Sequence, residues 1–583
     1  MDSDNTETAP KTFLLIAEHR HGHGSGHLHR CARLARELDG QVDWLLPEDP
    51  PDGHYSRRDA LRMLGEPELP IRWTDSPASS YDIVIIDRRE MTAAELNGLP
   101  DARLVIGIDL AGEARDRVDF AIDTLETPEQ VAPPNIADSG LLHLPDTVRD
   151  EWPREIRHVL VVFGGTGSGA TAAETGAAIP VPADGSVSVV AAPDTQVPPG
   201  LTVLRPSGDL SERLHQYDLV VTHYGLTAYE ATWARVPVVL LNPSPYHERL
   251  AERAGFRCVE RGTDLSAILK HPDSVVEAGR RIRPAGRSSL GDLVNGLLPP
   301  PRPTSPVDDR RFASALERFA ERTFFRHPET GLVFMKRYRP ATISYDREYF
   351  FSEYERQYGR TYLEDFDHIA AMGRRRMGRI LKYHGRHRRP RLLDIGCAYG
   401  PFLRAAADSG ADVLGVDVAD DAVRYVTETL GLPARTARFP DTGADELGGP
   451  FDIVTMWYVI EHFPDLDRVL ERVADLIRPG GLFAFSSPHG RGISARRDLR
   501  EFLRRSPEDH HTVLDRHSLN AVLSRFGFRL REFRSTGHHP ERFGLPLGRR
   551  AAAGQGFRYG LLRTISTVGG LGDTFEAIAE RSV

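Results

Sequence analysis

Short runs of β-branched and leucine residues recur along the chain, separated by stretches whose apolar positions follow a helical spacing. The runs lie at 13–17, 83–86, 159–163, 219–222, 236–241, 392–395, 413–416, 453–455 and 482–485. Apolar runs of this length that alternate with helices are typical of βαβ units, whose strands pair in parallel. The pattern therefore predicts an α/β protein built on parallel sheets.

The strand-like runs fall into two series with a proline-rich stretch between them. Proline fixes φ and lacks an amide donor, so this stretch suits neither a helix nor a central strand. A weaker junction near 146–157 divides the first series into halves. We therefore expect two Rossmann-like halves at 11–150 and 155–298, a linker at 299–308, a helical lead-in at 309–390, a third Rossmann-like domain at 391–540 and a C-terminal extension at 541–583.

Length and composition are those of a modular globular protein. The chain has 583 residues, and 83 acidic against 74 basic residues give a net charge of −9 with histidine neutral. This charge argues against nucleic acid as the main partner. No apolar run reaches the roughly 20 residues of a membrane span. The three cysteines form no Cys-x-x-Cys pair. We expect a cytoplasmic protein without an integral membrane segment or a disulfide framework.

The strongest chemical signal lies at 391–400. Asp394 stands near the end of a predicted strand, Gly396 and Gly400 follow in a small-residue turn, and Asp417 ends the next strand. Small residues after a parallel strand let backbone amides approach a ligand. A carboxylate at the end of the neighbouring strand can accept hydrogen bonds from ribose hydroxyls. The pattern indicates a nucleoside site.

Two later segments, 451–463 and 478–485, continue this pattern in order and spacing. Together these residues resemble the class I S-adenosylmethionine-dependent methyltransferases over about residues 345–535. The resemblance implies S-adenosylmethionine as cofactor and a sugar, glycoside or related small molecule as acceptor. A dinucleotide dehydrogenase fits less well, because Ala398 stands where a glycine usually admits the pyrophosphate. The cofactor-binding residues that the resemblance implies are Asp394, Gly396, Cys397, Ala398, Gly400, Asp417, Val418 and Trp457.

Methyl transfer from a sulfonium requires that the acceptor be positioned and deprotonated, and it requires no metal. Histidine titrates near neutrality and suits the role of base. The candidates are His462, His489, His510 and His511, of which His510 and His462 are preferred. The alternative is that His462 only buttresses its loop through a backbone hydrogen bond.

In the first series, the strand at 13–17 runs into a loop with five histidines, His19, His21, His23, His27 and His29. The glycines between them leave no ordered element to fix a ligand geometry, so we expect no metal there. His27 stands where the following helix begins. Either it is a functional group at the mouth of a site, or it only caps this helix.

The segment 24–31 has the pattern Gly-x-Gly-His-x-x-Arg-Cys. Further matches follow in order at 81–87, 104–109, 159–166, 217–230 and 235–240. Over about residues 11–260 the chain resembles the nucleotide-sugar hydrolase of pseudaminic acid biosynthesis and, more distantly, the N-acetylglucosaminyl transferase of peptidoglycan assembly. Those proteins have GT-B folds. The resemblance therefore implies a GT-B-like pair of Rossmann-type domains, a UDP-linked sugar, and His27 as the base that deprotonates water or an acceptor hydroxyl.

The residues expected to hold the nucleotide sugar lie in three glycine turns. Gly225, Leu226 and Thr227 begin a helix and can offer amides to a pyrophosphate, while Glu230 one turn later can hold ribose hydroxyls. The expected set is Gly24, Gly26, Gly164, Gly165, Thr166, Gly225, Leu226, Thr227 and Glu230.

The sequence thus predicts a bifunctional enzyme, a nucleotide-sugar hydrolase or glycosyltransferase fused to an S-adenosylmethionine-dependent methyltransferase. Its partners would be a nucleotide sugar and a small-molecule or glycan acceptor. Two alternatives stay open: an N-terminal half that only recognises a sugar nucleotide, for which His27 is dispensable, and a C-terminal half that is a degenerate S-adenosylmethionine binder. The sequence leaves open the sugar, the methyl acceptor atom, hydrolysis against transfer, and the oligomeric state.

Overall fold

The computed structural model divides the chain into two compact units. Unit 1 comprises residues 1–300 with Arg318–Arg322, and unit 2 comprises Pro301–Glu317 with Thr323–Val583. The structure describes residues 10–20, 26–50, 52–64, 70–127, 133–164, 168–181, 184–192, 195–205, 210–340, 355, 359–385, 389–543 and 557–582. Within these ranges, no helix has both the length and the apolar character needed to cross a membrane.

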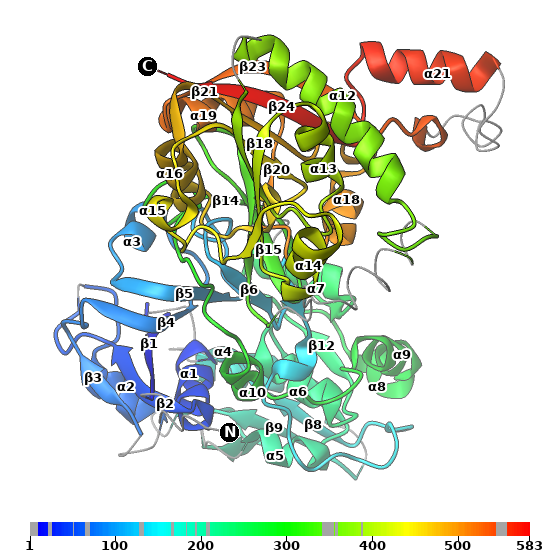
Figure 1. Cartoon of the computed structure of the whole chain (residues 1–583). Helices are drawn as coiled ribbons and strands as arrows, with labels where there is room; N and C mark the ends of the chain where they lie inside the picture. The colour runs from blue at the N-terminus through cyan, green and yellow to red at the C-terminus, as the bar shows by residue number, and fades with distance from the viewer. Residues whose placement is uncertain are drawn as a thin grey trace. The chain divides into compact units, whose positions relative to one another are not determined.

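The first sheet of unit 1 is parallel throughout and has the order β3-β2-β1-β4-β5-β6-β7 (Figure 1). The strand order reverses at β1, which pairs with both β2 and β4. Its apolar runs are buried because helices cover both faces of such a sheet. The strands are β1 (Lys11–Ala17), β2 (Gly40–Leu45), β3 (Arg72–Thr74), β4 (Ser80–Asp87), β5 (Asp101–Ile108), β6 (Phe120–Asp123) and β7 (Ile136–Ala137).

The second sheet of unit 1 repeats this topology with the order β10-β9-β8-β11-β12-β13, again all parallel. Its strands are β8 (His158–Val161), β9 (Ser186–Val190), β10 (Thr202–Leu204), β11 (Leu219–Thr222), β12 (Val238–Leu240) and β13 (Arg257–Cys258). The helices of unit 1 are α1 (Gly26–Glu37), α2 (Arg57–Leu64), α3 (Ala93–Asn97), α4 (Ser168–Ala178), α5 (Leu210–Arg213), α6 (Leu226–Trp233), α7 (Pro245–Ala254), α8 (Ser266–Lys270), α9 (Asp273–Ile282) and α10 (Leu290–Asn295). The predicted α/β architecture with Rossmann-like parallel sheets is confirmed.

Unit 2 contains a seven-stranded sheet of order β19-β18-β17-β20-β21-β24-β23. The strands are β17 (Arg391–Ile395), β18 (Asp412–Asp417), β19 (Ala434–Thr436), β20 (Phe451–Trp457), β21 (Ile477–Pro488), β23 (Phe528–Thr536) and β24 (Thr574–Arg581). β24 runs antiparallel to both of its neighbours. The expectation of an extension after residue 540 was therefore wrong, because 574–581 fill an interior position of the sheet.

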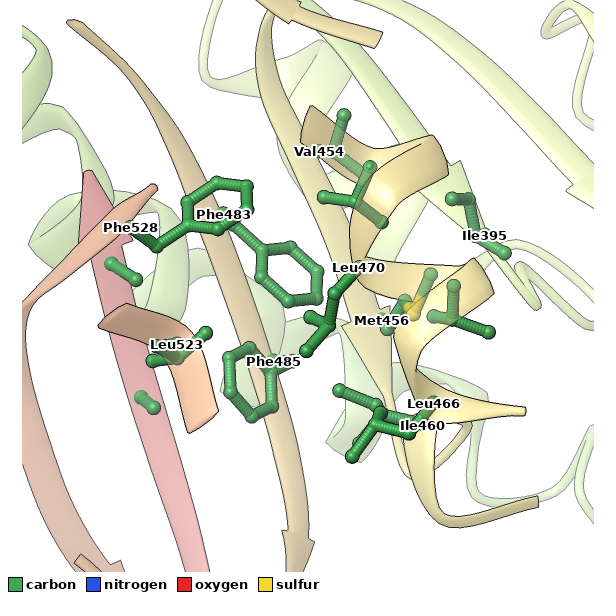
Figure 2. Close-up of a cluster of buried hydrophobic side chains, with 14 of the residues drawn as sticks. Ile395, Val454, Met456, Ile460, Leu466, Leu470, Phe483, Phe485, Leu523 and Phe528 are labelled. Carbon is green, nitrogen blue, oxygen red and sulfur yellow. The ribbon is translucent and has the colours of Figure 1, made fainter. Parts of the chain in front are cut away.

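Neighbouring residues of these strands point to opposite faces, and each face has its own apolar core. Leu393 packs with Phe483 and Phe485 on the face that α16 covers, as Figure 2 shows for the two phenylalanines. Leu392 and Leu482 belong to the opposite cluster, with side chains of α12 and α13. In Figure 1, α15 and α16 lie on one side of this sheet and α13 and α14 on the other. The helices of unit 2 are α12 (Phe366–His384), α13 (Pro401–Asp408), α14 (Asp420–Arg424), α15 (Ala444–Leu447), α16 (Leu466–Leu476), α17 (Ile493–Arg497), α18 (Leu499–Arg505), α19 (Arg516–Arg525) and α21 (Phe557–Val568).

The helical lead-in expected at 309–390 is only partly helical. Three strands, β14 (Ser314–Phe319), β15 (Arg322–Arg326) and β16 (Val333–Arg337), form a four-stranded sheet with β22 (Thr512–Val513). The β-branched and aromatic residues that favour strands are concentrated here, and β15 and β16 are almost entirely buried. The helix α12 follows only after this sheet.

We predict that Phe575→Ala destabilises unit 2 by about 3–5 kcal/mol, because Phe575 is fully buried on β24 and its ring contacts Phe485 and Phe533. Denaturant-dependent hydrogen exchange of β21, β23 and β24 amides measures this loss. The control is Leu561→Ala on α21, where the side chain is exposed and the expected cost is below about 0.5 kcal/mol. A cost below about 1 kcal/mol for Phe575→Ala would contradict the interior position of β24.

Candidate functional site

Unit 1 contains a cavity of about 1700 Å³ that is lined by residues following strands of both of its sheets. Arg89 follows β4 and Asp109 follows β5 of the first sheet, whereas Gly164 follows β8 and His223 follows β11 of the second. His27, the second residue of α1, lies in the same wall. Ligands of open parallel sheets bind at the carboxyl ends of the strands. The cavity therefore lies where a ligand is expected.

His27 is held by the carboxylate of Asp87, which was not among the expected site residues. The ring nitrogen Nδ1 of His27 lies 2.6 Å from Oδ1 of Asp87, the last residue of β4. The Asp87 side chain is fully buried, while 14% of the His27 side chain is exposed. Asp87 pairs in register with Ala17 at the end of β1. Because α1 follows β1, these adjacent strand ends bring His27 and Asp87 together.

Arg30, one turn after His27 on α1, binds the same carboxylate. Its Nε donates to Oδ2 of Asp87 at 2.7 Å and its Nη2 donates to Oδ1 at 2.6 Å. The remaining nitrogen, Nη1, donates to Thr124 at 2.6 Å and also to Asp109. Burial alone would raise the pKa of Asp87, but Arg30 and His27 outweigh burial and hold this pKa well below its usual range.

Most of the residues expected to bind a nucleotide sugar line this cavity. Gly225 is the N-cap of α6, and Leu226 and Thr227 begin the helix. Glu230 lies one turn further along, and Gly26 is the first residue of α1. The expected contacts of Gly24, Gly165 and Thr166 fall outside the described residues.

Gly164 also lines the cavity, and its backbone amide has a partner within unit 1. Its amide N–H donates to Nε2 of His223 at 3.0 Å. Nδ1 of His223 lies 3.0 Å from the carbonyl oxygen of Tyr224. Since Nε2 accepts, Nδ1 carries the hydrogen, which fixes the neutral tautomer of His223. The Gly164 amide therefore already has an acceptor in this structure.

Glu230 has a perturbed carboxyl group. Burial raises its pKa to about 7, and the nearby Arg33 only partly offsets this effect. Both side chains line the cavity. Glu230 can therefore change its protonation state near neutral pH.

In unit 2, the turn after β17 has the backbone that the sequence indicated. Gly396 and Gly400 have φ values of +72° and +79°, which L side chains rarely adopt. A Cβ on Gly396 would lie 2.4 Å from a methyl carbon of Val459, and one on Gly400 would lie 2.8 Å from a methyl carbon of Val426. Both positions therefore require glycine. Cys397 lies in this turn and is buried.

Asp417, at the end of β18, ties this turn to the neighbouring strand. Its Oδ2 accepts the amide N–H of Ala398 at 2.8 Å and its Oδ1 accepts that of Ala419 at 2.9 Å. A carboxylate oxygen can accept more than one hydrogen bond, so ribose hydroxyls can still be held here. The adjacent Val418 is a 51% exposed apolar side chain. A carboxylate beside an exposed apolar side chain fits the ribose and base of a nucleoside such as S-adenosylmethionine.

Asp394 and Trp457 complete the expected cofactor set. Asp394 is buried and accepts a hydrogen bond from Oγ1 of Thr455 at 2.6 Å, and burial raises its pKa to about 7. The indole Nε1–H of Trp457 is buried without a hydrogen-bond partner among the described residues. The Arg376 guanidinium stacks 4.1 Å from the centroid of the Trp457 ring. An unsatisfied buried donor at the end of β20 is consistent with a polar ligand.

The preferred candidate bases lie side by side. The rings of His462 and His510 are 4.7 Å apart between centroids. Nδ1 of His462 lies 2.8 Å from Oδ2 of Asp509. Glu461 is buried, and burial raises its pKa to about 7. Ligand atoms of Glu461, His462 and His510 all lie within 4.8 Å of one another, a spacing that a divalent metal ion could also use.

The other two candidate bases are in less suitable surroundings. His489 is buried, with Nδ1 2.9 Å from the carbonyl oxygen of Gly572. Burial lowers the pKa of His511 to about 4. The structure therefore favours His462 and His510 over these two residues.

Part of unit 2 is similar to known methyltransferases. Residues 362–532 match the family model of a methyltransferase domain. The chain is 32% identical over 127 residues to a ubiquinone biosynthesis O-methyltransferase of Bordetella avium, covering 21% of this chain and 53% of that protein. It is 34% identical over 108 residues to the protein of the same name from Shewanella halifaxensis, covering 18% of this chain and 45% of that protein. The chain thus spans about half the length of these relatives.

Among solved structures, an S-adenosylmethionine-dependent methyltransferase from Archaeoglobus fulgidus aligns at 17% identity with a TM-score of 0.28, covering 39% of this chain and 98% of that chain. A magnesium protoporphyrin IX methyltransferase from Synechocystis, with bound S-adenosylhomocysteine, aligns at 17% identity with a TM-score of 0.28, covering 40% and 98%. Unit 2 thus contains a segment similar to a methyltransferase domain, and S-adenosylmethionine is the cofactor.

We predict that Asp417→Ala weakens S-adenosylmethionine binding by about 1–3 kcal/mol, because it removes charge-assisted hydrogen bonds from the turn and the ribose. Isothermal titration calorimetry on the full chain measures the change. Asp412→Ala is the matched control, since Asp412 begins the same strand and its side chain is 61% exposed. Equal affinities of the Asp417 variant and the unaltered protein would refute this assignment.

Proposed function

We propose that the chain is a bifunctional enzyme in which unit 1 cleaves or transfers a UDP-linked sugar and unit 2 methylates an oxygen of a sugar, glycoside or related small molecule. The observation that carries the unit 1 proposal is the Asp87-bound His27 in the wall of the cavity. A histidine oriented by a carboxylate is suited to general base catalysis. Two parallel sheets that share one cavity also support a GT-B-like arrangement of unit 1.

In unit 1, the amides at the start of α6 would bind the diphosphate, because a helix N-terminus carries partial positive charge. Glu230 would hold the ribose hydroxyls. His27 would take the proton of a water molecule or an acceptor hydroxyl through its Nε2. The oxygen then forms its bond to the anomeric carbon while the bond to the nucleoside diphosphate breaks, and attack opposite the leaving group inverts that carbon.

In unit 2, Asp417 and the glycine turn would hold the cofactor beside the strand ends. S-adenosylmethionine supplies a methyl group already activated on a sulfonium. What remains for the protein is to orient the acceptor and remove its proton. His462, held by Asp509, and the adjacent His510 are placed to take that proton. The ubiquinone O-methyltransferase relatives support oxygen as the accepting atom.

A second candidate is that unit 1 binds a sugar nucleotide without turning it over. One observation favours it: the Gly164 amide, expected to help hold the diphosphate, already donates to His223. In that case the cavity would serve recognition, and the chain would have methyltransferase activity alone.

The two candidate functions predict different effects of His27→Ala on the release of UDP. We expect the unaltered protein to release UDP from at least one UDP-sugar of a panel, and we expect His27→Ala to reduce that rate by about 100-fold or more through loss of the base. A coupled assay for free UDP measures it. Binding of UDP itself should stay within about threefold of the parent value. UDP release that survives the substitution would remove His27 from the mechanism.

Binding of UDP-sugars should also depend on pH through Glu230. Its ionised form accepts hydrogen bonds from ribose, and its pKa is about 7, so protonation competes with binding as the pH falls. We expect affinity to weaken between pH 8 and pH 6, by at most about tenfold per pH unit below pH 7. Calorimetry on Glu230→Gln should give a flatter pH profile of affinity, because glutamine does not titrate. The other titrating groups of the cavity are unchanged. An identical slope in both proteins would contradict this role.

A further inference from the structure

The Asp87 carboxylate has more hydrogen-bonding partners than a plain structural residue at a strand end requires. It meets Nδ1 of His27, two nitrogens of Arg30, and Sγ of Cys31 at 3.7 Å, all inside unit 1. Its side chain is fully buried. A buried carboxylate is costly unless it is paired and hydrogen-bonded, and here the pairing includes His27, the proposed base of unit 1.

We propose that Asp87, clamped by Arg30, is a positioning residue that fixes His27 in the tautomer with its hydrogen on Nδ1, leaving Nε2 as the basic nitrogen toward the cavity. This inference rests on the proposed function of His27. The carboxylate is ionised and has no hydrogen to donate, so the short contact requires that Nδ1 be the donor. A neutral imidazole then has its lone pair on Nε2.

Arg30 makes this arrangement rigid. Its guanidinium forms two hydrogen bonds to Asp87, and its third nitrogen is fixed by Thr124 and Asp109. Asp109 is fixed in turn by the amide and the hydroxyl of Thr124 and by the amide of Leu125. Because the planar guanidinium matches a carboxylate in two parallel hydrogen bonds, the Asp87 plane cannot rotate without breaking both.

The charges of the network also suit a base. Asp87 and Asp109 contribute two negative charges against one positive charge on Arg30. When Nε2 of His27 takes a proton, the imidazolium formed next to Asp87 balances the second carboxylate. The positive charge that develops on His27 during proton transfer therefore forms beside a carboxylate.

The spacing on α1 explains how one carboxylate serves both residues. His27 and Arg30 are three residues apart on the helix, so their side chains lie on the same face. Asp87 meets that face from the end of β4. A His-x-x-Arg pair at the start of a helix, with an aspartate ending the adjacent strand, is the corresponding sequence signature.

The tautomer can be measured without any turnover. Full-length protein with ¹⁵N-labelled histidine is examined by long-range ¹H–¹⁵N correlation spectroscopy, and the His27 signals are those lost in His27→Gln. We expect a protonated Nδ1 and an unprotonated Nε2 at neutral pH. The opposite tautomer would overturn the proposal. If no UDP-sugar is turned over, the proposed function of unit 1 fails, yet this spectrum still decides whether Asp87 positions His27.

The kinetic test is Asp87→Asn, compared with Asp82→Asn. An asparagine at 87 must place an N–H against either Arg30 or His27, so it disturbs the clamp at nearly constant volume. We expect kcat for UDP release to fall by about 100-fold or more with KM within about threefold, and the His27 tautomer to change. Asp82 lies on the same strand and accepts hydrogen bonds from Thr12 at 3.0 Å, so Asp82→Asn should keep the parent kcat.

Arg30→Lys supplies the second variant if Asp87→Asn does not fold. It keeps the charge and loses the paired hydrogen bonds, so we expect a smaller fall in kcat, about tenfold, with the Nδ1-protonated tautomer partly retained. The proposal would be overturned if Asp87→Asn kept the parent kcat and an unchanged His27 tautomer. If only Arg30→Lys folds, the same result in that variant would overturn it.

Discussion

In a parallel sheet every strand ends at the same edge, and this constraint determines where the chemistry of the chain can lie. Asp87 and Asp109 end or follow neighbouring strands of one sheet, and Asp417 ends a strand next to the turn after β17. His27 and Asp87 are 60 positions apart in the sequence. They meet because parallel strands end at one edge of the sheet. The helices that follow the strands then direct backbone amides toward the same edge.

Four of the carboxyl groups described above, Asp87, Glu230, Asp394 and Glu461, fall into two classes. Asp87 is kept ionised by a guanidinium that touches both of its oxygens. Glu230, Asp394 and Glu461 have no such clamp, and burial raises the pKa of each to about 7. The first class suits a fixed acceptor that orients a base. The second class can change protonation near neutral pH, which suits groups that respond to a ligand or take part in proton transfer.

The sequence predicted the elements whose signals are local. Apolar runs such as 13–17 and 392–395 became central strands, and the turn with Gly396 and Gly400 has the backbone that its glycines indicated. Features that depend on distant pairing were missed. β24 pairs with β21 across about 90 residues, and the strands at 314–337 were hidden by their many charged residues. Asp87 was missed as a partner of His27 because no local spacing links a strand end to a helix that precedes it by 60 residues.

We propose that this chain holds two separate nucleoside sites, one for a sugar nucleotide in unit 1 and one for S-adenosylmethionine in unit 2. Calorimetric titration of the full chain with UDP and with S-adenosylhomocysteine, each alone and each after saturation with the other, tests it most directly. We expect one site for each ligand per chain and an unchanged stoichiometry in the presence of the other ligand. Absence of UDP binding, or displacement of one ligand by the other, would contradict it.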